Sequence, residues 1–423
     1  MTADRLPDGW RRRTCDEVIR AYAGIARLPT SPGERRVAAA LAERLRGLGY
    51  RAGVEPVRAT SSYALPIGLL SAAGLAAGLL SRYGVPSHGG GSYSGGSYGG
   101  ARRAAARWGA AVVAAAASAA IADDVAGGSR WFRRVALPHR RAHNVVAYGG
   151  DPTATRTVVV LAHHDAAPSG VIFDQRVLRW VARHFPAVIA AAKENPPTWW
   201  PVILGPALVA VGAASGDRRL GGLGTAITAA NLAFLADIGR RPAVPGANDN
   251  LSGVAALVCV ARALQREPVS GLRVVLLSAG AEEALQEGIR GFARRHFPDL
   301  GPGTCFVNLE SVGSGRLALL EGEGPVLMRD YPEPFRRFVA ECARDIGVPL
   351  LRGLRSRNST DSEVPRRHGY PVATIVSLDH DKLITHYHLD SDVPDNVDLD
   401  SVVSAAELAE AVIRRLAREE PAP

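Results

Sequence analysis

Short apolar runs alternate with amphipathic segments along the second half of the chain. The runs at 272–278, 305–310 and 371–377 are rich in Val, Leu and Ile, which is typical of strands buried on both faces of a sheet. Between and after these runs, apolar residues recur at helical spacing, and the helices this predicts are 252–265, 286–296, 334–346 and 401–418. The alternation predicts an α/β fold, a three-layer α/β/α sandwich around a mainly parallel central sheet.

The first half of the chain contains similar elements in a less regular order. Apolar residues at helical spacing predict two helices, at 16–26 and 34–48, and a strand is expected at 50–57. Two more apolar runs, 144–148 and 157–162, are expected to be adjacent strands joined by a Gly-Gly-Asp-Pro turn. These elements complete the predicted sandwich.

Two pairs of long uncharged runs interrupt this pattern. The first pair, Ala59–Ser81 and Trp108–Ala122, is separated by a Gly/Ser-rich spacer, Ser87–Gly100, which is expected to be flexible. The second pair is Asn195–Gly216 and Leu220–Ala236. Each pair predicts an apolar helical hairpin inserted into the α/β domain.

The length of the uncharged runs bears on membrane association, because crossing a bilayer takes about 20 apolar residues. Two of the four runs are long enough, and Trp108, Trp199 and Trp200 lie near run ends, as in an interfacial aromatic belt. We expect the hairpins to span a membrane; the alternative is buried or interface-forming hairpins in a soluble protein. A slight excess of arginine on the domain side of the first hairpin, and the lack of a signal-peptide core, favour a cytoplasmic α/β domain.

These patterns predict an α/β domain that two insertions divide into three parts. The expected organisation is 1–58, N-terminal helices and strand; 59–125, first apolar hairpin with its Gly/Ser-rich loop; 126–171, α/β domain, first part; 172–240, an amphipathic helix around 176–192 and the second apolar hairpin; and 241–423, α/β domain, second part.

Charge and cysteine content exclude some classes of function. The net charge is +9, but the basic residues are dispersed and are not interleaved with stacking aromatic residues, so no nucleic-acid partner is predicted. The four cysteines lie in separate elements without the spacing of a zinc site or a disulfide framework. They suit a reducing compartment.

Acidic and histidine side chains gather at the ends of four predicted strands, 157–162, 272–278, 305–310 and 371–377. Sites in open α/β sheets lie at the carboxyl ends of parallel strands, so we expect these side chains to meet. They are His163, Asp165, Glu282, Glu283, Glu310 and His388.

Asp249 lies in a Gly/Asn-rich turn directly before a predicted helix. Such a turn alone is more often a helix cap. Two neighbouring zinc ions, however, need nitrogen and carboxylate ligands and one bridging carboxylate. With His163, Glu283, Glu310 and His388, the chain offers enough ligands for two zinc ions.

The neighbours of these ligands suggest further roles. Asp165 can orient His163 by a hydrogen bond, and one of Glu282 and Glu283 can act as general base while the other binds metal. His164 is an alternative to His163 as a ligand. We expect His380 and His386 to be solvated or to support a ligand, and Asp390 and Asp392 to form turns or to support a ligand. Asp361, in a Thr-Asp pair, is expected to cap a turn.

The order His-x-Asp, Gly-Ala-x-Asp-x-x-Ser-Gly, Glu-Glu, Asn-x-Glu-x-x-Gly, Tyr-His resembles metallopeptidase family 28 over roughly 140–170 and 245–415. This family contains di-zinc aminopeptidases related to bacterial leucyl aminopeptidases, glutamate carboxypeptidases and glutaminyl cyclases. The resemblance implies that Asp249 bridges two zinc ions, that His163 and Glu310 complete one site, and that Glu283 and His388 complete the other. It also implies Glu282 as general base, Tyr387 as a donor to the oxyanion, and Asp361 as a residue on the substrate side.

The chain departs from the family pattern at three places. Glu310 stands where many members have Asp, the interval from His163 to Asp249 contains an apolar hairpin, and the stretch after Glu283 is looser than the usual Gly-Leu-x-Gly-Ser. These departures bear more on substrate preference than on metal binding.

We therefore expect a membrane-associated zinc aminopeptidase that removes N-terminal residues from peptide or aminoacyl substrates. One alternative is a glutaminyl-cyclase-like acyltransferase that uses one zinc ion, and another is a catalytically inactive peptidase-like membrane scaffold. The intact ligand set argues against both alternatives. The sequence does not indicate the preferred side chain or the oligomeric state.

Overall fold

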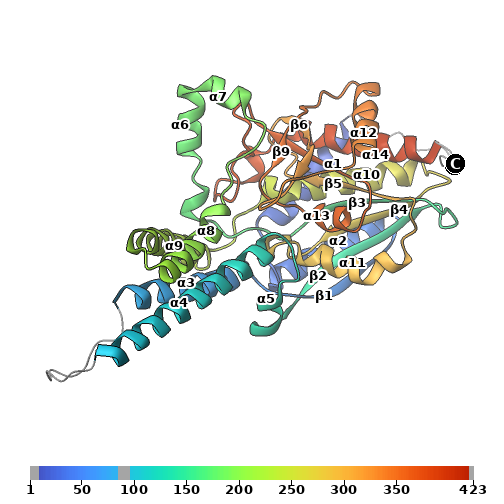
Figure 1. Ribbon diagram of the computed structural model, residues 1–423. Coiled ribbons are helices and arrows are strands. Elements are labelled where there is room, and N and C mark those ends of the chain that lie inside the picture. The colour runs from blue at the N-terminus through green and yellow to red at the C-terminus, as the bar shows by residue number, and fades with distance from the viewer. Residues whose placement is uncertain (1–8, 84–95, 419–423) are drawn as a thin grey trace.

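A seven-stranded sheet forms the centre of the computed structural model, which describes residues 9–83 and 96–418 (Figure 1). The strands are β1 (Arg51–Ala59), β2 (Arg140–Gly150), β3 (Thr157–His163), β4 (Arg273–Ala279), β5 (Thr304–Glu310), β6 (Arg316–Leu319) and β10 (Val372–Leu378), in the order β1-β2-β4-β3-β5-β10-β6. The central strands β4, β3, β5 and β10 are parallel, and the outer strands β1, β2 and β6 pair antiparallel. The core of the sheet is therefore parallel, as predicted.

Helices cover both faces of this sheet and form the predicted three layers. One face carries α1 (Trp10–Ala23), α2 (Pro32–Gly47), α10 (Gly253–Arg266), α12 (Glu333–Asp345) and α14 (Leu399–Arg418). The other face carries α11 (Glu287–His296) and α13 (Glu363–Arg367), and a small second sheet contains β7 (Gly322–Glu323), β8 (Arg329–Asp330) and β9 (Arg355–Ser356).

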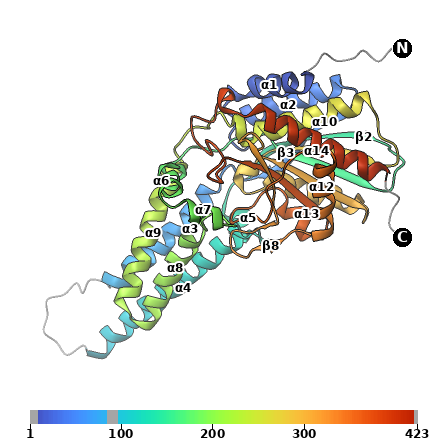
Figure 2. The ribbon, with the colours of Figure 1, turned by 90° about the horizontal axis from the view of Figure 1, so that it is seen from above.

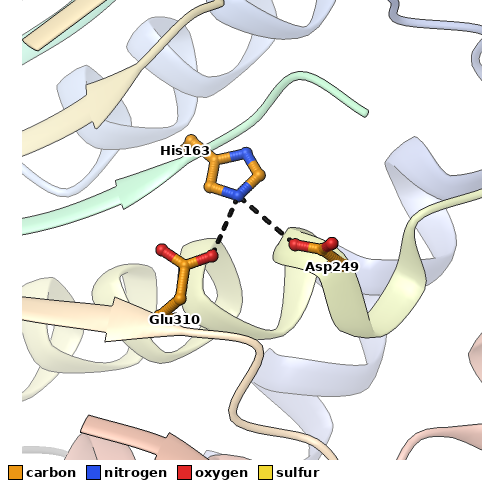
Figure 3. Close-up of side chains that lie close together, drawn as sticks. All are labelled: His163, Asp249 and Glu310. Carbon is orange, nitrogen blue, oxygen red and sulfur yellow. Dashed lines mark hydrogen bonds and ion pairs between the residues drawn. The ribbon is translucent and has the colours of Figure 1, made fainter. Parts of the chain in front are cut away.

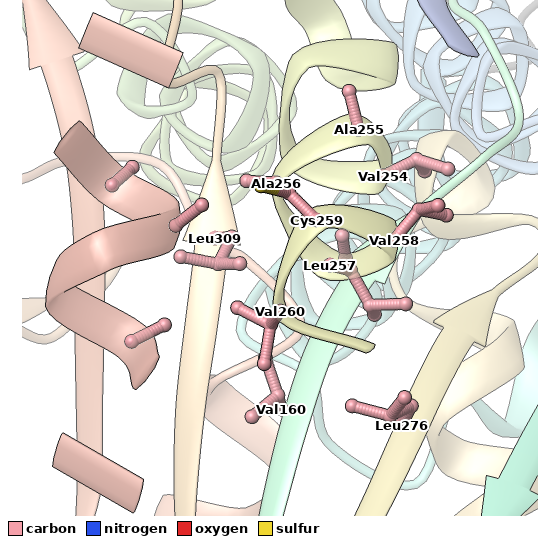
Figure 4. Packing of buried hydrophobic residues seen from close by; sticks show 14 of the residues in the cluster. Val160, Val254, Ala255, Ala256, Leu257, Val258, Cys259, Val260, Leu276 and Leu309 are labelled. Carbon is pink, nitrogen blue, oxygen red and sulfur yellow. The ribbon is translucent and has the colours of Figure 1, made fainter. Parts of the chain in front are cut away.

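The continuous apolar runs are explained by burial on both sides of the sheet. In β3, Val158 and Val160 belong to the core under α10, whereas Val159 and Leu161 belong to the core under α11. Successive side chains of a strand point to opposite faces, so in a strand covered on both faces neither set of side chains faces water. Figure 4 shows Val160 packed beneath the buried helix α10.

The predicted adjacency of the strands around 144–148 and 157–162 is wrong. Strand β4 lies between β2 and β3, because Gly150 at the end of β2 and Thr157 at the start of β3 both pair with Arg273. The intervening turn passes over the start of β4, where the N–H of Asp151 donates to Leu272 O at 2.9 Å. A turn of this length can span the width of one strand, about 5 Å on each side.

Four helices form a bundle that projects from the sandwich (Figures 1 and 2). They are α3 (Ala64–Tyr83), α4 (Gly96–Val125), α8 (Trp200–Ser215) and α9 (Arg218–Ile238). Glycines allow close packing: a Cβ atom at Gly212 would lie 2.3 Å from the backbone nitrogen of Gly221. By length and composition, α3, α4 and α9 could cross a membrane, and α8 is shorter.

The helices around the bundle differ from the sequence prediction in two details. Residues 87–95 of the predicted flexible spacer lie outside the described residues, whereas residues 96–100 begin α4. The amphipathic helix predicted around 176–192 is two helices, α6 (Arg176–His184) and α7 (Pro186–Ala191), separated at a proline that cannot continue the hydrogen-bonding pattern of α6. A short helix, α5 (Trp131–Ala136), follows α4.

Candidate active site

Three of the predicted ligands meet at the carboxyl end of the parallel strands (Figure 3). His163 ends β3, Glu310 ends β5, and Asp249 lies in the turn before α10. The Nε2 atom of His163 is 3.2 Å from Glu310 Oε1 and 3.3 Å from Asp249 Oδ1. The three side chains are buried and offer ligand atoms within 4.8 Å of one another.

The other two predicted ligands form a second group around the same aspartate. The Nε2 atom of His388 is 3.2 Å from Asp249 Oδ2 and 3.3 Å from Glu283 Oε1. Asp249 thus directs one carboxylate oxygen at each group, which is the arrangement expected of a carboxylate that bridges two metal ions. All five predicted ligands are brought together.

The carboxylates around His388 create a negative potential that favours a positive charge in this group. Burial lowers the pKa of His388, but the carboxylates of Glu283 and Asp249 outweigh burial and raise the pKa to about 10. Burial raises the pKa of Glu283 above its ordinary value. The Nδ1 atom of His388 has no hydrogen-bond partner among the described residues. Buried imidazole nitrogens and carboxylate oxygens at these distances form a donor set that fits zinc.

Asp165 supports both groups at once. Its carboxylate lies 3.4 Å from Nδ1 of His163, as expected for a residue that orients this ligand. It also accepts the backbone N–H groups of Glu282 and Glu283, each at 3.0 Å. A single carboxylate therefore holds the histidine and the turn that carries the two glutamates.

Glu282 lies next to the predicted metal ligands, and no ion pair of its side chain with Lys or Arg occurs among the described residues. It offers an oxygen to a group with His163 and Glu283, and its Oε1 accepts a hydrogen bond from Gln286 Nε2 at 2.9 Å. Burial, and then the negative charge of Asp361, raise the pKa of Glu282 well above its ordinary value. A carboxylate with a raised pKa can exchange a proton near neutral pH.

Asp361 belongs to this electrostatic environment, and the capping role considered for it is absent. It is completely buried, and neither of its carboxylate oxygens has a hydrogen-bond partner among the described residues. Burial, and then Glu310, raise its pKa well above the ordinary value.

Tyr387 is partly buried and stacks on His388, with ring centroids 3.9 Å apart. Phe173, in a short turn of helix that precedes α6, packs on both rings and lies 4.3 Å from the ring of His388. Burial raises the pKa of Tyr387 well above its ordinary value, so its hydroxyl remains a proton donor.

The structure distinguishes the remaining candidates. His164 points away from the group and lies 2.9 Å from Ser278 Oγ. His386 pairs with Ser391, and Asp390 is exposed. Asp392 accepts the backbone N–H groups of Asn248 at 2.7 Å and Asp249 at 3.0 Å, and therefore fixes the turn that carries the bridging carboxylate.

Arg27 is a supporting residue that the sequence did not reveal. It is completely buried and donates to the carbonyl groups of His164, Pro245 and Gly246 at 2.8, 2.5 and 2.6 Å. Burial lowers its pKa to about 10, although Asp392 favours the charged form. Arg27 lies alone between two predicted helices, and the sequence around it contains no motif that would assign it to a site.

The model of peptidase family M28 matches residues 231–413. This part of the chain belongs to peptidase family M28. It contains Asp249, Glu282, Glu283, Glu310 and His388, whereas His163 precedes it. The match to this peptidase family implies a hydrolase site of the zinc-dependent type.

Solved structures share the fold of this chain at low sequence identity. A glutaminyl cyclase from Bacteroides thetaiotaomicron is 13% identical over 97% of this chain and 98% of its own, with a TM-score of 0.56. A leucine aminopeptidase precursor from the same species is 13% identical over 97% of both chains, with a TM-score of 0.53. A Zn-dependent exopeptidase from Parabacteroides distasonis is 14% identical over 95% of this chain and 97% of its own, with a TM-score of 0.53. None of the curated proteins matches the chain.

The M28 site is tied to the helical bundle by a buried ionic network. Arg133 in α5 lies 2.7 Å from Asp124 at the end of α4 and 2.9 Å from Glu287 in α11. The same guanidinium donates to Ala284 O at 2.7 Å, and Arg130 donates to Leu285 O. The base of the bundle therefore contacts the segment directly after Glu283.

Proposed function

We propose that the protein is an aminopeptidase with two zinc ions, one held by His163 and Glu310, the other by Glu283 and His388, and both by Asp249. The observation that carries this proposal is the position of Asp249, whose two oxygens lie 3.3 and 3.2 Å from the two histidines. Membership in family M28 supports a zinc-dependent hydrolase, and aminopeptidases are among the structures that share the fold.

The zinc ions would supply electrophilic polarisation of the scissile carbonyl and a lowered pKa for the attacking water. Glu282 would accept the proton of that water and return it to the leaving amine, for which its raised pKa suits it. The hydroxyl of Tyr387 would donate a hydrogen bond to the oxyanion. Asp165 would keep His163 and the Glu282–Glu283 turn in place through the three contacts described above.

The proposed reaction is tested with a panel of aminoacyl-anilides and detergent-purified protein. We expect cleavage that a chelator abolishes and added zinc restores. The Glu282→Gln variant should lose about 100- to 10,000-fold in kcat, because it lacks the base, while it keeps its zinc content. A variant as active as the wild type would contradict the assignment of Glu282.

The same preparation separates the two alternatives. A glutaminyl-cyclase-like acyltransferase would convert N-terminal glutaminyl peptides and bind one zinc ion per chain. A catalytically inactive scaffold would bind zinc without turnover of any substrate. Zinc content measured by atomic spectroscopy distinguishes the acyltransferase from the proposed two-zinc hydrolase, and turnover of the anilide panel distinguishes the inactive scaffold from it.

We further propose that the bundle spans a membrane and that the catalytic domain lies in the cytoplasm. Three of its helices have the length and composition for this. Each of the four helices also exposes large apolar side chains, among them Leu80, Val112, Val211 and Leu223. Exposed apolar surface of this kind is rare on soluble monomers. Labelling of introduced cysteines in intact cells and in inverted vesicles tests the orientation.

A further inference from the structure

One surface next to the active site exposes an unusual number of large apolar side chains. The residues 171–191, here called the interfacial segment, comprise a short turn of helix at 171–173, α6 and α7. Its exposed apolar residues are Val171, Ile172, Val177, Trp180, Phe185 and Val188, with exposed fractions between 44% and 71%. Large apolar patches on a protein surface mark interaction sites.

The other side of the interfacial segment is held against the catalytic domain. Gln175 donates to Ile384 O at 2.7 Å, and Arg179 lies 2.9 Å from Asp379. Lys382 donates to the carbonyl groups of Ala190 and Ala192, both at 2.8 Å. These contacts fix the segment, so its apolar residues face outward in the folded protein.

Charges border the apolar residues in the way expected of a helix at a membrane surface. Arg176 and Arg183 lie on α6 beside Trp180; Arg176 pairs with Asp174, whereas no ion pair of Arg183 occurs among the described residues. A helix with Trp and other apolar residues on one side and arginine beside them binds at the boundary between lipid headgroups and acyl chains.

The position of the interfacial segment fits this chemistry. It lies where the bundle meets the catalytic domain, and α6 is seen end-on in Figure 2 while the bundle helices are seen lengthwise. Helix α6 therefore runs across the bundle rather than along it. At the same end of the bundle, α5 exposes Trp131 by 50% and Val135 by 84%. Both features lie where the surface of a bilayer around the bundle would be.

We propose that the interfacial segment rests in the surface of a bilayer containing anionic phospholipids, and that it holds the zinc site against that surface. Phe173 of the same segment contacts His388 and Tyr387, so the segment joins the membrane surface to the active site. The substrate class that follows is amphiphilic peptides whose free N-terminus lies at the bilayer surface. This inference rests on the proposed membrane-bound aminopeptidase.

The depth of the segment is tested by spin labelling in nanodiscs of neutral and anionic phospholipid. All four native cysteines are buried, so Val177→Cys gives a specific site. Ile346→Cys, at an exposed position after α12, is the control for water, and Val112→Cys, on α4, is the control for lipid. We expect the label at 177 to collide with oxygen more than with a water-soluble nickel complex, at a depth of about 5–10 Å.

Each other outcome of the depth measurement overturns the inference. If the label at 177 is exposed to water like the label at 346, while the label at 112 contacts lipid, the bundle spans the membrane but the interfacial segment does not contact its surface. Water exposure at both 112 and 177 defeats the membrane proposal as well. Protection of position 177 from both collision partners indicates that a protein, such as a second copy, covers the segment.

Activity provides a second, independent measurement. A double variant, Val177→Glu with Trp180→Glu, should lower kcat/KM at least about 10-fold for a peptide anchored in vesicles by an apolar C-terminal tail. Its kcat/KM for a soluble aminoacyl-anilide should not change. The conservative pair Val177→Leu with Trp180→Phe should match the wild type on both substrates. Equal loss on both substrates would mean that the double variant damages the site itself, and it would overturn the inference.

Discussion

Asp165 and Asp392 show how single carboxylates organise the site without being predicted ligands. Each accepts two consecutive backbone N–H groups, those of Glu282 and Glu283 for Asp165, and those of Asn248 and Asp249 for Asp392. Hydrogen bonds to a charged group each contribute about 1.5–3 kcal/mol. The two turns that carry the bridging aspartate and the glutamate pair are therefore fixed before a metal ion binds.

Asp392 gives a first prediction at this scale. The Asp392→Asn variant should bind zinc about 10- to 100-fold more weakly, because supporting residues of this kind typically contribute that much to metal affinity. Competition with a chromophoric chelator measures the change. Asp390→Asn, at an exposed neighbouring position, is the matched control and should bind zinc like the wild type.

Glu323 gives a second prediction, on pH. Burial, and then Glu363, raise the pKa of Glu323 well above its ordinary value. Between the pKa of the unfolded state and that of the folded state, only the folded protein keeps the proton, so stability falls as pH rises through this window. Glu323→Gln should therefore raise the melting temperature at pH 8 by about 2–4 °C and have little effect at pH 4.

Melting temperatures of the Glu323→Gln variant and the wild type, measured at pH 4 and at pH 8, test this prediction. A larger gain at pH 4 than at pH 8 would contradict the assignment of a raised pKa. Because Glu323 is not a predicted zinc ligand, the zinc content of the variant should equal that of the wild type.

At the scale of secondary-structure elements, the contact between the bundle and the catalytic turn is the main feature. Asp124 at the end of α4, Arg133 in α5 and Glu287 in α11 form a buried ionic network, and Arg133 also binds the carbonyl of Ala284. Asp165 thus holds the turn that carries Glu282 and Glu283. The base of the bundle holds the residues that directly follow this turn.

Arg133→Met should destabilise the protein by about 3–5 kcal/mol, because the buried carboxylates of Asp124 and Glu287 lose their nearer cation and keep only Arg130, at 3.9 and 3.5 Å. Arg134→Met is the matched control, since Arg134 is exposed and no ion pair of its side chain occurs among the described residues. Chemical unfolding in detergent measures the difference. If Arg133→Met lowers the free energy of unfolding no more than Arg134→Met does, the network does not hold the bundle and the catalytic domain together.

At the scale of the whole molecule, the proposed zinc site lies where the parallel sheet and the inserted helices meet. Asp249, Glu283 and Glu310 bring three carboxylates into one buried space, so removal of the cations leaves them to repel one another. Chelation should therefore lower the melting temperature as well as the activity, and zinc should restore both. Calorimetry with and without chelator measures this. An unchanged melting temperature, with zinc removal verified by atomic spectroscopy, would contradict bound zinc as a contributor to stability.

The sequence alone determined the layers of the fold and most of the site. Apolar runs buried on both faces and the helical spacing between them predict the sandwich, and the position of His163, Glu283, Glu310 and His388 at strand ends predicts where they meet. Both predictions depend on the spacing of apolar residues, which is encoded within short segments of the chain.

Only the tertiary structure decided the strand order and the residues that support the site from a distance. The insertion of β4 between β2 and β3 depends on pairing with a strand more than a hundred residues away, which no local pattern encodes. Arg27, Asp361 and the Arg133 network likewise acquire their roles from segments that lie far apart in the chain. Their function follows from burial and from partners, and both arise only when the sheet, its helices and the bundle pack together.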